Sequence, residues 1–560
     1  MGINMSKSLG KSSFHVRHLI VLILITILCY LPFVNKAVHI DDPLFIWAAQ
    51  HIQSHPTNPY NFDVNWYGRT MPMYEVTKNP PLASYYMAGL ASFFGWGEQA
   101  LHLAFLLPLI GLITGTYLLA LHFCSRPFDA SLIALLTPVV LLSATTLMCD
   151  VLMLCFWVWA ILLWIKGIQS NGKSLLLASA LFIACSALTK YFGLNLIFLL
   201  LIWTIAERRR LDSSILFLLI PAAALAGYHW VTFVLYGKGL LVDAATYSVE
   251  FVAMGSKTFI SKFLIGFAFT GGCFVIILFY LRRLWNAIFL IMNVLIAIAF
   301  IILLVKLGTI GKVILVSDMG IRWDYILQFS FCALAGINLI FLAIVDVFQK
   351  RDANSLLLFL WVIGTFLFTV FINWSINGRT LLPLAPAVGI LIVRRIESRQ
   401  KASVSGSAWK NYVPLVPAGI LALIITYSDY NLANTIRNDA ATIVKQYQSP
   451  NSTIWFQGHW GFQYYMESYR CKPLDVSQPN LAAGDIIVNP LNSTNLYRLP
   501  SYMPLCDSLE SKTFTWLTCM NKQARAGFYS DVWGPLPFIF GTVQPEHYNI
   551  HISEKELRHR

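Results

Sequence analysis

Long apolar runs, repeated along most of the chain, limit what this sequence can fold into. About thirteen can be placed, several of them shorter than the roughly 20 residues that a helix perpendicular to a bilayer needs. They cover approximately Leu19–Val34, Leu101–His122, Phe128–Thr146, Val151–Ile165, Ser174–Leu188, Leu194–Ile205, Ser214–Tyr236, Phe259–Leu281, Ala287–Val305, Tyr325–Val347, Ser355–Ile372, Leu381–Val393 and Val413–Tyr427. Only 12% of the residues are charged, against about 25% in soluble domains, so the chain cannot cover its own surface in water. The sequence therefore predicts an α-helical polytopic membrane protein.

Basic residues between the runs predict the orientation of the chain. If the N-terminus is cytoplasmic and the number of helices is odd, every second loop lies inside, and these loops are the basic ones. They contain Arg126, Lys166, Lys173, Arg208, Arg209, Arg210, Arg282, Arg283, Lys350, Arg351, Arg394, Arg395, Arg399, Lys401 and Lys410. We expect a multi-pass protein of the cell inner (plasma) membrane whose tail is periplasmic or extracellular. The net charge of +13 is spread over these clusters, which gives no support to nucleic-acid binding.

The polar segment His39–Leu82 follows the first run and belongs to an outer loop of about residues 38–100. It holds two adjacent carboxylates, Asp41 and Asp42, among tryptophans and tyrosines that are typical of a membrane–water boundary. An acid at such a boundary costs free energy to desolvate unless it is paired or used, so we expect a functional site here. The alternative is that the acids only cap a helix, with Pro43 in its first turn.

The tail, residues 428–560, predicts a small extracytoplasmic α/β domain after a transmembrane domain over residues 1–427. Strands are expected at Thr453–Gln457 and Asp485–Asn489, with a helix over FQYYMESYR between them. The aromatic stretch Gly527–Gly541 is expected to pack on the domain core or on the membrane face. The sequence contains no zinc-protease, dinucleotide-binding or Walker motif, which argues against those enzymes and against an ATP-driven pump.

Several short motifs follow one another in an order that resembles a known enzyme class. They are the acidic pair Asp41-Asp42, the Lys-Asn-Pro-Pro-Leu box at Lys78–Leu82, MCDVLM with Asp150, LTKYFG with Lys190, and NGRTLLPLAP with Arg379 and Pro383. Over about Leu19–Ile396 the chain resembles the GT-C membrane glycosyltransferases, above all the protein O-mannosyltransferases and the lipid A aminoarabinose transferases. It departs from the family in having Asp-Asp rather than Asp-Glu in the first loop, and Asn79 where a basic or His residue is common.

The resemblance implies transfer of one sugar from a polyprenyl-phosphate carrier to an acceptor on the outer face of the membrane, the acceptor being a lipid, a glycan or a protein. Phosphate is already a good leaving group, so one general base for the acceptor suffices, and we expect Asp41 in that role. Asp42 orients this base, binds the sugar or holds a cation, and Asp150 is a second acid. The expected substrate-binding residues are Lys78, Lys190, Arg379, Asn79 and Tyr85, with the cations on the phosphate. The sequence leaves a divalent metal open and implies no other cofactor.

Other interpretations stay open at this point. A lipid-linked sugar transporter or flippase is the main alternative, although such proteins place ionisable residues near the bilayer midplane, and here the unusual charges gather at the outer ends of the runs. A receptor that binds through its tail leaves the acidic loop unexplained. Single residues also have ordinary explanations: Asp150 as a helix N-cap, and Lys190 and Arg379 as cations that reach for lipid headgroups.

Overall fold

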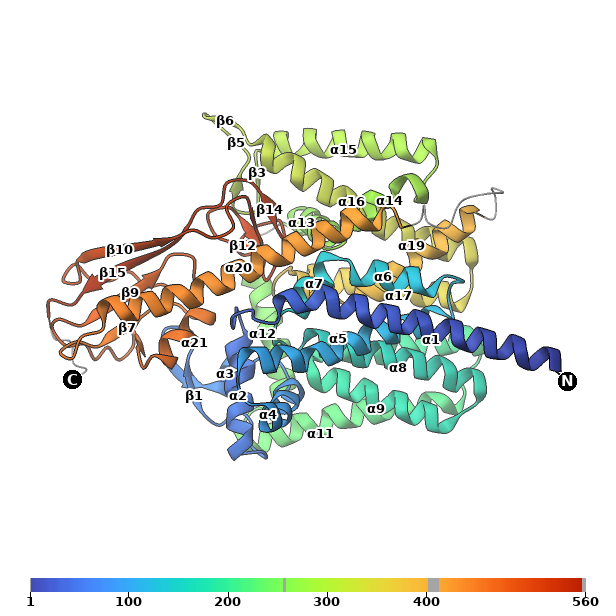
Figure 1. Ribbon diagram of the computed structural model, residues 1–560, viewed down its shortest axis with the longest axis horizontal. Helices are drawn as coiled ribbons and strands as arrows, with labels where there is room; N and C mark the ends of the chain where they lie inside the picture. Colours follow the sequence, from blue (N-terminus) through green and yellow to red (C-terminus); the bar gives the residue numbers. More distant parts are fainter. Residues whose placement is uncertain (1, 255–257, 401–411, 556–560) are drawn as a thin grey trace.

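The computed structural model describes residues 2–254, 258–400 and 412–555 as one elongated molecule (Figure 1). Most of its helices run side by side along the long axis. We call the end of this bundle that carries the N-terminus the basic end, and the end that carries the C-terminal sheet-containing domain the domain end. Lys401 and Lys410 of the predicted basic loops lie outside the described residues.

Nine helices of the described part are long and apolar enough to cross a membrane, and counting each of two bent helix pairs as one span raises the number to 11. The nine are α1 (Gly2–Tyr30), α5 (Glu98–Ala120), α8 (Asp150–Ser170), η2 with α10 (Tyr191–Leu194 and Asn195–Arg208), η3 with α11 (Ser213–Leu218 and Leu219–Tyr236), α15 (Ala287–Leu307), α16 (Trp323–Lys350), α17 with η4 (Ala353–Leu367 and Phe368–Ile372) and α20 (Leu415–Tyr447). The chain is therefore a multi-pass helical membrane protein, as the apolar runs predicted.

The two bent pairs are α6 with α7 and α13 with α14, with bounds Pro127–Leu135, Pro138–Ala144, Phe259–Cys273 and Ile276–Leu284 and bends of 63° and 88°. Pro138 explains the first bend, because proline lacks an N–H and holds Thr137 before it in an extended conformation. Two more predicted runs fall on the 17-residue helices α9 (Lys173–Thr189) and α19 (Leu384–Gln400). Each predicted run thus lies on a helix or a bent pair, while the count of about thirteen spans stays a prediction.

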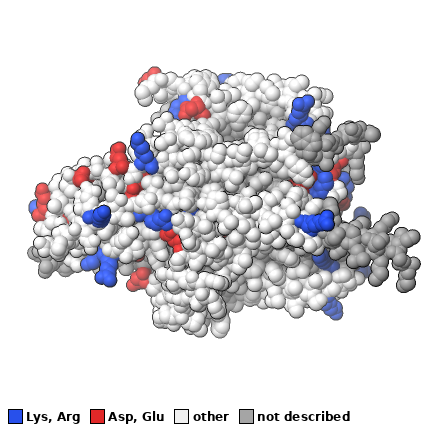
Figure 2. Space-filling model, viewed as in Figure 1, with Lys and Arg blue, Asp and Glu red and all other residues white. Residues whose placement is uncertain are grey.

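Charged side chains gather towards the two ends of the visible face, and a broad, nearly uncharged band lies between them (Figure 2). The surface helix α15 illustrates the band, because Ile291, Val294 and Ile298 are exposed on it. Large apolar side chains at the surface of a bundle suit hydrocarbon and not water. We infer that the bilayer surrounds this band, with the functional site near one of its edges.

The polar segment after α1 is ordered at the domain end, as its aromatic content predicted. It comprises α2 (Asp42–Ser54), a hairpin of β1 (Asp63–Asn65) and β2 (Thr70–Pro72), the short α3 (Met73–Val76) and α4 (Leu82–Phe94). Tyr60, Val64 and Trp66 of the segment form a small buried cluster, to which Leu240 contributes from α12 (Leu240–Met254). This cluster fixes the loop against the bundle.

The C-terminal domain continues directly from α20, so the predicted boundary at residue 428 falls inside one 33-residue helix. Its five-stranded sheet has the order β10-β15-β9-β7-β8; β7 is parallel to β8 and β9, and the other pairs are antiparallel. The elements are β7 (Ile454–Phe456), α21 (Gly461–Ser468), β8 (Lys472–Pro473), β9 (Ile486–Pro490), β10 (Leu505–Ser511) and β15 (Glu546–Ile552). The predicted strands and helix of this domain are confirmed as β7, β9 and α21, with bounds that differ by one or two residues.

The aromatic stretch Gly527–Gly541 packs on the membrane helices. Gly378 N donates a hydrogen bond to Phe528 O at 2.8 Å, and Phe540 N donates one to Gln328 Oε1 at 2.7 Å. Gly378 has no room for a side chain, because a Cβ there would lie 2.2 Å from the Phe528 ring. This close contact brings part of the C-terminal domain to the functional site.

Candidate active site

The backbone turns sharply immediately before α2. Ile40 has a φ of +46°, which a β-branched residue rarely adopts, and such strain is concentrated at functional sites. Asp41 takes the N-cap position of α2, yet its carboxylate makes no capping hydrogen bond. Its Oδ2 accepts a hydrogen bond from Arg379 Nη2 at 2.9 Å. Helix capping alone therefore does not account for this acid.

Asp42 points into the protein. It is fully buried, and its two oxygens accept hydrogen bonds from His39 N at 3.0 Å and from Leu147 N at 2.9 Å. Burial raises the pKa of Asp42 to about 7, although the charge of Lys36 and the two backbone hydrogen bonds oppose the rise. Because both oxygens hold backbone groups, Asp42 fixes the turn that presents Asp41.

Arg379 lies on the single helical turn α18 (Gly378–Leu381), between η4 and α19. Asn377 caps this turn, since its Oδ1 accepts a hydrogen bond from Thr380 N at 2.9 Å. The guanidinium carbon lies 5.6 Å from the ring centroid of Tyr529, within the range of a cation–π contact. Arg379 is thus held between a carboxylate of the first loop and an aromatic ring of the C-terminal domain.

Asp150 and Lys190 form a second pair of opposite charge. Asp150 is the first residue of α8, and Lys190 follows the last residue of α9 in an extended conformation. Lys190 Nζ lies 2.5 Å from Asp150 Oδ1. The N-cap position of α8 belongs to Cys149, so Asp150 is not the N-cap that the alternative interpretation assigned to it.

Lys78 and Asn79 lie just before α4. Lys78 Nζ is 2.6 Å from Asp243 Oδ2 of α12 and 5.2 Å from the ring centroid of Tyr247. Asn79 accepts a hydrogen bond through its carbonyl oxygen from the Tyr60 hydroxyl, at 2.9 Å. The hydroxyl of Tyr85 donates to Pro56 O at 2.5 Å and holds α4 to the loop.

Most of these residues line one cavity of about 680 Å³ at the domain end. The predicted residues in its wall are Asp41, Lys78, Asn79, Asp150, Lys190 and Arg379. Asp42 and Tyr85 are not part of the wall among the described residues. The structure therefore brings together charges that stand as much as 338 positions apart in the sequence.

The cavity wall has two further regions of different chemistry. An apolar and aromatic region comes from α12 and from the segment around η4, and includes Phe251, Phe368, Ile372 and Trp374. The C-terminal domain supplies a polar and aromatic region with His459, Trp460, Thr494, Asn495 and Trp533. His459 is buried, its Nε2 lies 2.9 Å from the Thr494 hydroxyl, and burial lowers its pKa to about 3. His459 is therefore neutral at physiological pH and adds no charge to the cavity.

The structure also contains a buried ion pair behind the cavity, Lys36–Asp429, which was not predicted from the sequence. Lys36 Nζ lies 2.5 Å from Asp429 Oδ2, and both side chains are fully buried. Asp429 also accepts a hydrogen bond from the Tyr529 hydroxyl at 2.8 Å. Asp429 lies two residues beyond the last predicted run, Val413–Tyr427, on the same helix α20. This position was the available signal, since an acid in a membrane helix is rarely without a partner.

The described residues contain no group of three or more His, Cys, Asp or Glu side chains arranged to hold a metal ion. Asp41 and Asp150, the two acids in the cavity wall, each contact a basic side chain. A divalent metal remains a prediction of the sequence alone.

Residues 78–233 match the family model described as dolichyl-phosphate-mannose-protein mannosyltransferase. No curated protein sequence matches the chain significantly. This matched segment includes Lys78, Asn79, Asp150 and Lys190.

Among solved structures, the chain resembles the Archaeoglobus fulgidus oligosaccharyltransferase tethered with an acceptor peptide (14% identity, TM-score 0.46, 85% of this chain and 66% of that chain). It also resembles ArnT from Cupriavidus metallidurans bound to undecaprenyl phosphate (13% identity, TM-score 0.43, 86% and 93%). A third similar structure is the arabinofuranosyltransferase AftD from mycobacteria (13% identity, TM-score 0.37, 95% and 41%). The chain spans slightly less than two thirds of the length of the archaeal enzyme. The family match confirms the resemblance that the motifs indicated: over residues 78–233 the chain is related to the protein mannosyltransferases, which are GT-C membrane glycosyltransferases.

Proposed function

We propose that this protein is an integral-membrane glycosyltransferase that moves one sugar from a polyprenyl-phosphate carrier to an acceptor lipid, glycan or protein. The observation that carries the proposal is the presence of two carboxylate–cation pairs, Asp41–Arg379 and Asp150–Lys190, on the wall of one cavity. The matched family is named for a sugar donor of this chemical class, dolichyl-phosphate mannose.

Asp41 is the general base in this proposal. The acceptor oxygen or nitrogen forms a bond to the anomeric carbon of the sugar, the bond between that carbon and the phosphate oxygen breaks, and the acceptor proton passes to Asp41. The electron pair of the broken bond stays on the phosphate. A positioned base of this kind contributes about 10²–10⁴-fold to the rate. Asp150 faces the same cavity, 2.5 Å from Lys190, and is the second acid.

Arg379 is the main phosphate ligand in this proposal, with Lys190 and Lys78 as further cations. In the structure the Arg379 guanidinium donates a hydrogen bond to Asp41 Oδ2 at 2.9 Å and so occupies a carboxylate oxygen that the acceptor proton would need. A carrier phosphate that competes for Arg379 loosens the contact and frees Asp41 to take a proton. The charge that grows on the leaving phosphate then strengthens the Arg379 contact in the transition state. Donor binding and activation of the base are thereby coupled.

The apolar wall around Phe251, Phe368 and Trp374 is the proposed path for the prenyl chain. A prenyl chain gains free energy where it contacts aromatic and aliphatic groups, while its phosphate needs the cations of the same cavity. An amphipathic carrier matches both parts of this wall. A water-soluble nucleotide sugar has no long apolar chain to place along this wall.

Reconstituted protein given radiolabelled polyprenyl-phosphate hexoses and pentoses, with membrane extract as the acceptor, tests the proposal. We expect release of polyprenyl phosphate together with transfer of the label, and a loss of roughly 10²-fold or more in Asp41→Asn. Asp324→Asn is the matched control, because Asp324 is exposed beside Arg322 and lies outside the cavity wall. Asp42→Asn is expected to lower transfer less than Asp41→Asn.

The same assay separates transfer from transport. A lipid-linked sugar transporter or flippase moves the labelled carrier across the vesicle membrane without releasing polyprenyl phosphate. Near wild-type transfer by Asp41→Asn assigns the base to Asp42 or Asp150, or rejects the proposal.

The domain end is proposed to face the outside of the cell and the basic end the cytoplasm. This orientation follows from the basic loops, such as Arg208–Arg210 after α10. A cysteine introduced at Arg209 is expected to resist a membrane-impermeant thiol reagent in intact cells, while a cysteine introduced at Asn451 reacts. The opposite labelling pattern reverses the orientation.

A further inference from the structure

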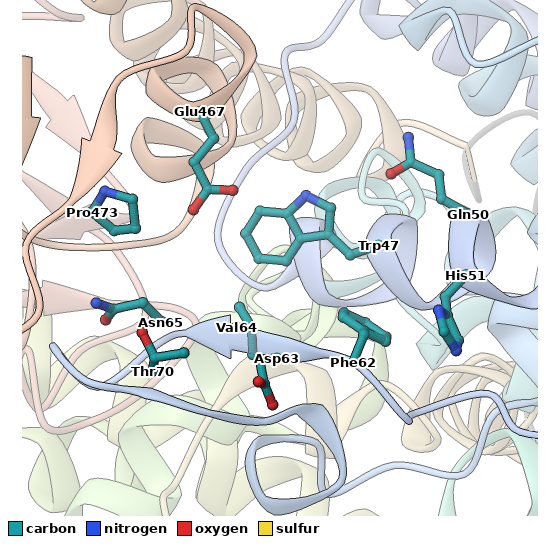
Figure 3. A pocket seen from close by; sticks show the side chains of 10 residues that line it. All are labelled: Trp47, Gln50, His51, Phe62, Asp63, Val64, Asn65, Thr70, Glu467 and Pro473. Carbon is teal, nitrogen blue, oxygen red and sulfur yellow. The ribbon is translucent and has the colours of Figure 1, made fainter.

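A second hollow, which we call the outer pocket, lies where the first loop meets the C-terminal domain (Figure 3). Its volume is about 480 Å³, within the usual size range of small-molecule sites. It is lined by Trp47, Gln50, His51, Phe62, Asp63, Val64, Asn65, Thr70, Glu467 and Pro473. In Figure 3, Glu467 reaches from α21 towards the indole of Trp47 on α2, while Asn65 and Thr70 stand on the other side of the hollow.

The polar groups of the outer pocket are fixed before any ligand arrives. Gln463, which is fully buried, donates hydrogen bonds from its Nε2 to Glu467 Oε1 at 2.8 Å and to Asn65 O at 2.9 Å. Asn65 Nδ2 donates to Leu474 O at 3.2 Å. Thr70 N donates to Asp475 Oδ2 at 2.8 Å, which ties the hairpin to the domain. A prearranged polar set of this kind lowers the entropy cost of binding.

The chemistry of the lining selects a neutral, hydroxyl-rich ligand. None of the ten lining residues is Lys or Arg, and Asp63 and Glu467 are acids, so an anionic ligand is repelled. The amides of Gln50 and Asn65 offer donors and acceptors together. A sugar hydroxyl matches both, whereas an ammonium group only donates. The indole of Trp47 offers a flat apolar face for the C–H side of a pyranose ring.

The outer pocket and the catalytic cavity share an aromatic wall. The ring centroid of Trp47 is 6.2 Å from that of Trp66, and Trp66 lies 4.5 Å from His459. Trp66 and His459 both line the cavity, while Trp47 lines the pocket. The lining of the pocket thus lies one aromatic contact from the lining of the cavity, a distance that a glycan of a few units can span.

We propose that the outer pocket binds a neutral sugar unit of the acceptor, so that the acceptor is a glycan. This inference rests on the proposed function, because it assigns the acceptor of the same transfer reaction. The pocket holds a unit that does not react, and the reacting hydroxyl belongs to another unit inside the cavity.

Binding can be tested without transfer. Saturation-transfer NMR on the full chain in nanodiscs, with methyl glycosides of neutral hexoses as probes, is expected to show binding that Trp47→Ala weakens at least tenfold. Trp47→Phe keeps an aromatic face and is expected to restore part of the signal, and Glu467→Gln to weaken it. Asp324→Asn is expected to leave the signal unchanged, since Asp324 is exposed beside Arg322 and lines neither the outer pocket nor the cavity. The thermal midpoint of each variant checks that the fold is intact.

Two results overturn the inference. In the first, neutral glycosides do not bind the wild type, or they bind the Trp47→Ala variant equally well; in that case carrier-dependent transfer still stands. Alternatively, a lysine-containing peptide competes better than any glycoside, which makes the pocket a site for a cationic acceptor. If glycosides bind as expected and no polyprenyl phosphate is released in the transfer assay, the proposed function fails instead.

Discussion

The pairs Lys36–Asp429 and Asp41–Arg379 both tie the segment after α1 to later parts of the chain. They differ in their access to ligands. The side chains of Lys36 and Asp429 are 0% exposed. Those of Asp41 and Arg379 are 29% and 13% exposed on the wall of the cavity. A charge that is fully buried cannot leave its partner without a large desolvation cost, whereas a charge beside a cavity can exchange its partner for a ligand. The first pair is therefore structural, and the second is available for chemistry.

Tyr529 connects the two pairs. Its hydroxyl donates to Asp429 at 2.8 Å, and its ring lies below the guanidinium of Arg379, 5.6 Å away. The buried pair thus holds the ring against which Arg379 rests. The comparison predicts that changes at Lys36 or Asp429 lower stability first, and that changes at Asp41 or Arg379 lower turnover first.

The largest effect is expected at the buried pair. Asp429→Asn leaves the charge of Lys36 buried without a counter-charge, which costs about 3–5 kcal/mol of folding stability. Thermal unfolding of the purified protein and the amount of folded protein in the membrane measure this loss. The double variant Lys36→Met with Asp429→Asn is expected to recover stability, because no unpaired charge remains. Wild-type stability of the single variant contradicts the structural role of the pair.

Arg379→Ala is expected to reduce turnover at saturating carrier by roughly 10²–10³-fold, the usual cost of one lost charge-stabilising donor. Carrier affinity falls as well, and folding stability changes less than in Asp429→Asn. Arg322→Ala is the matched control, because Arg322 is 41% exposed and its described side-chain partners, Asp324 and the ring of Tyr325, are its near neighbours in the sequence. The comparison between the pairs breaks down if Arg379→Ala unfolds the protein, or if it changes only the apparent affinity for the acceptor.

Lys78→Ala is expected to have a smaller effect on turnover and carrier affinity, about tenfold at most. Lys78 lines the cavity but shares its charge with Asp243 at 2.6 Å, so it neutralises a phosphate less than Arg379 does. Lys312→Ala, in the exposed turn between β3 (Thr309–Ile310) and β4 (Val313–Ile314), is expected to change neither quantity. If Lys78→Ala and Lys312→Ala change turnover and carrier affinity equally, Lys78 is not a ligand of the phosphate. Lys257, another outer-loop lysine for which little change was expected, lies outside the described residues.

The pH dependence of stability is expected to show the smallest effect. The pKa of Asp42 is raised to about 7 in the folded protein, against about 3.9 in the unfolded chain, so the folded state binds the proton more tightly. The contribution of Asp42 to the free energy of unfolding is fully present below its unfolded-state pKa of about 3.9 and is lost as the pH rises towards 7. The thermal midpoint should fall by a few °C between about pH 5 and 8, since long chains shift little per kcal/mol. Asp42→Asn is expected to remove this dependence of the thermal midpoint on pH, and Asp324→Asn to keep it.

The helices and the gathering of the candidate site residues at one end of the bundle could be predicted from the sequence for a local reason. A membrane helix can be recognised from about 20 consecutive apolar residues, and basic loops mark one end of the bundle. Asp41, Asp150, Lys190 and Arg379 therefore fall at one end from hydropathy and charge alone. The number of spans was harder to predict, because bent pairs such as α13 with α14 make one long run or two short ones.

The pairing of charges could not be predicted, because it depends on contacts between distant segments. Lys36 and Asp429 stand 393 positions apart, and a single sequence carries no signal that joins them. The contacts that distinguish Asp41 from Asp42 were equally hidden. It depends on the turn at Ile40, which sends one carboxylate to Arg379 and the other to the backbone of Leu147.

A structure of the protein with bound undecaprenyl phosphate tests the central claim most directly. The account predicts a phosphate oxygen within hydrogen-bond distance of the Arg379 guanidinium, an Asp41 carboxylate that has moved away from Arg379 towards the open cavity, and an unchanged Lys36–Asp429 pair at 2.5 Å. A phosphate bound elsewhere, with the 2.9 Å contact between Arg379 and Asp41 intact, contradicts it.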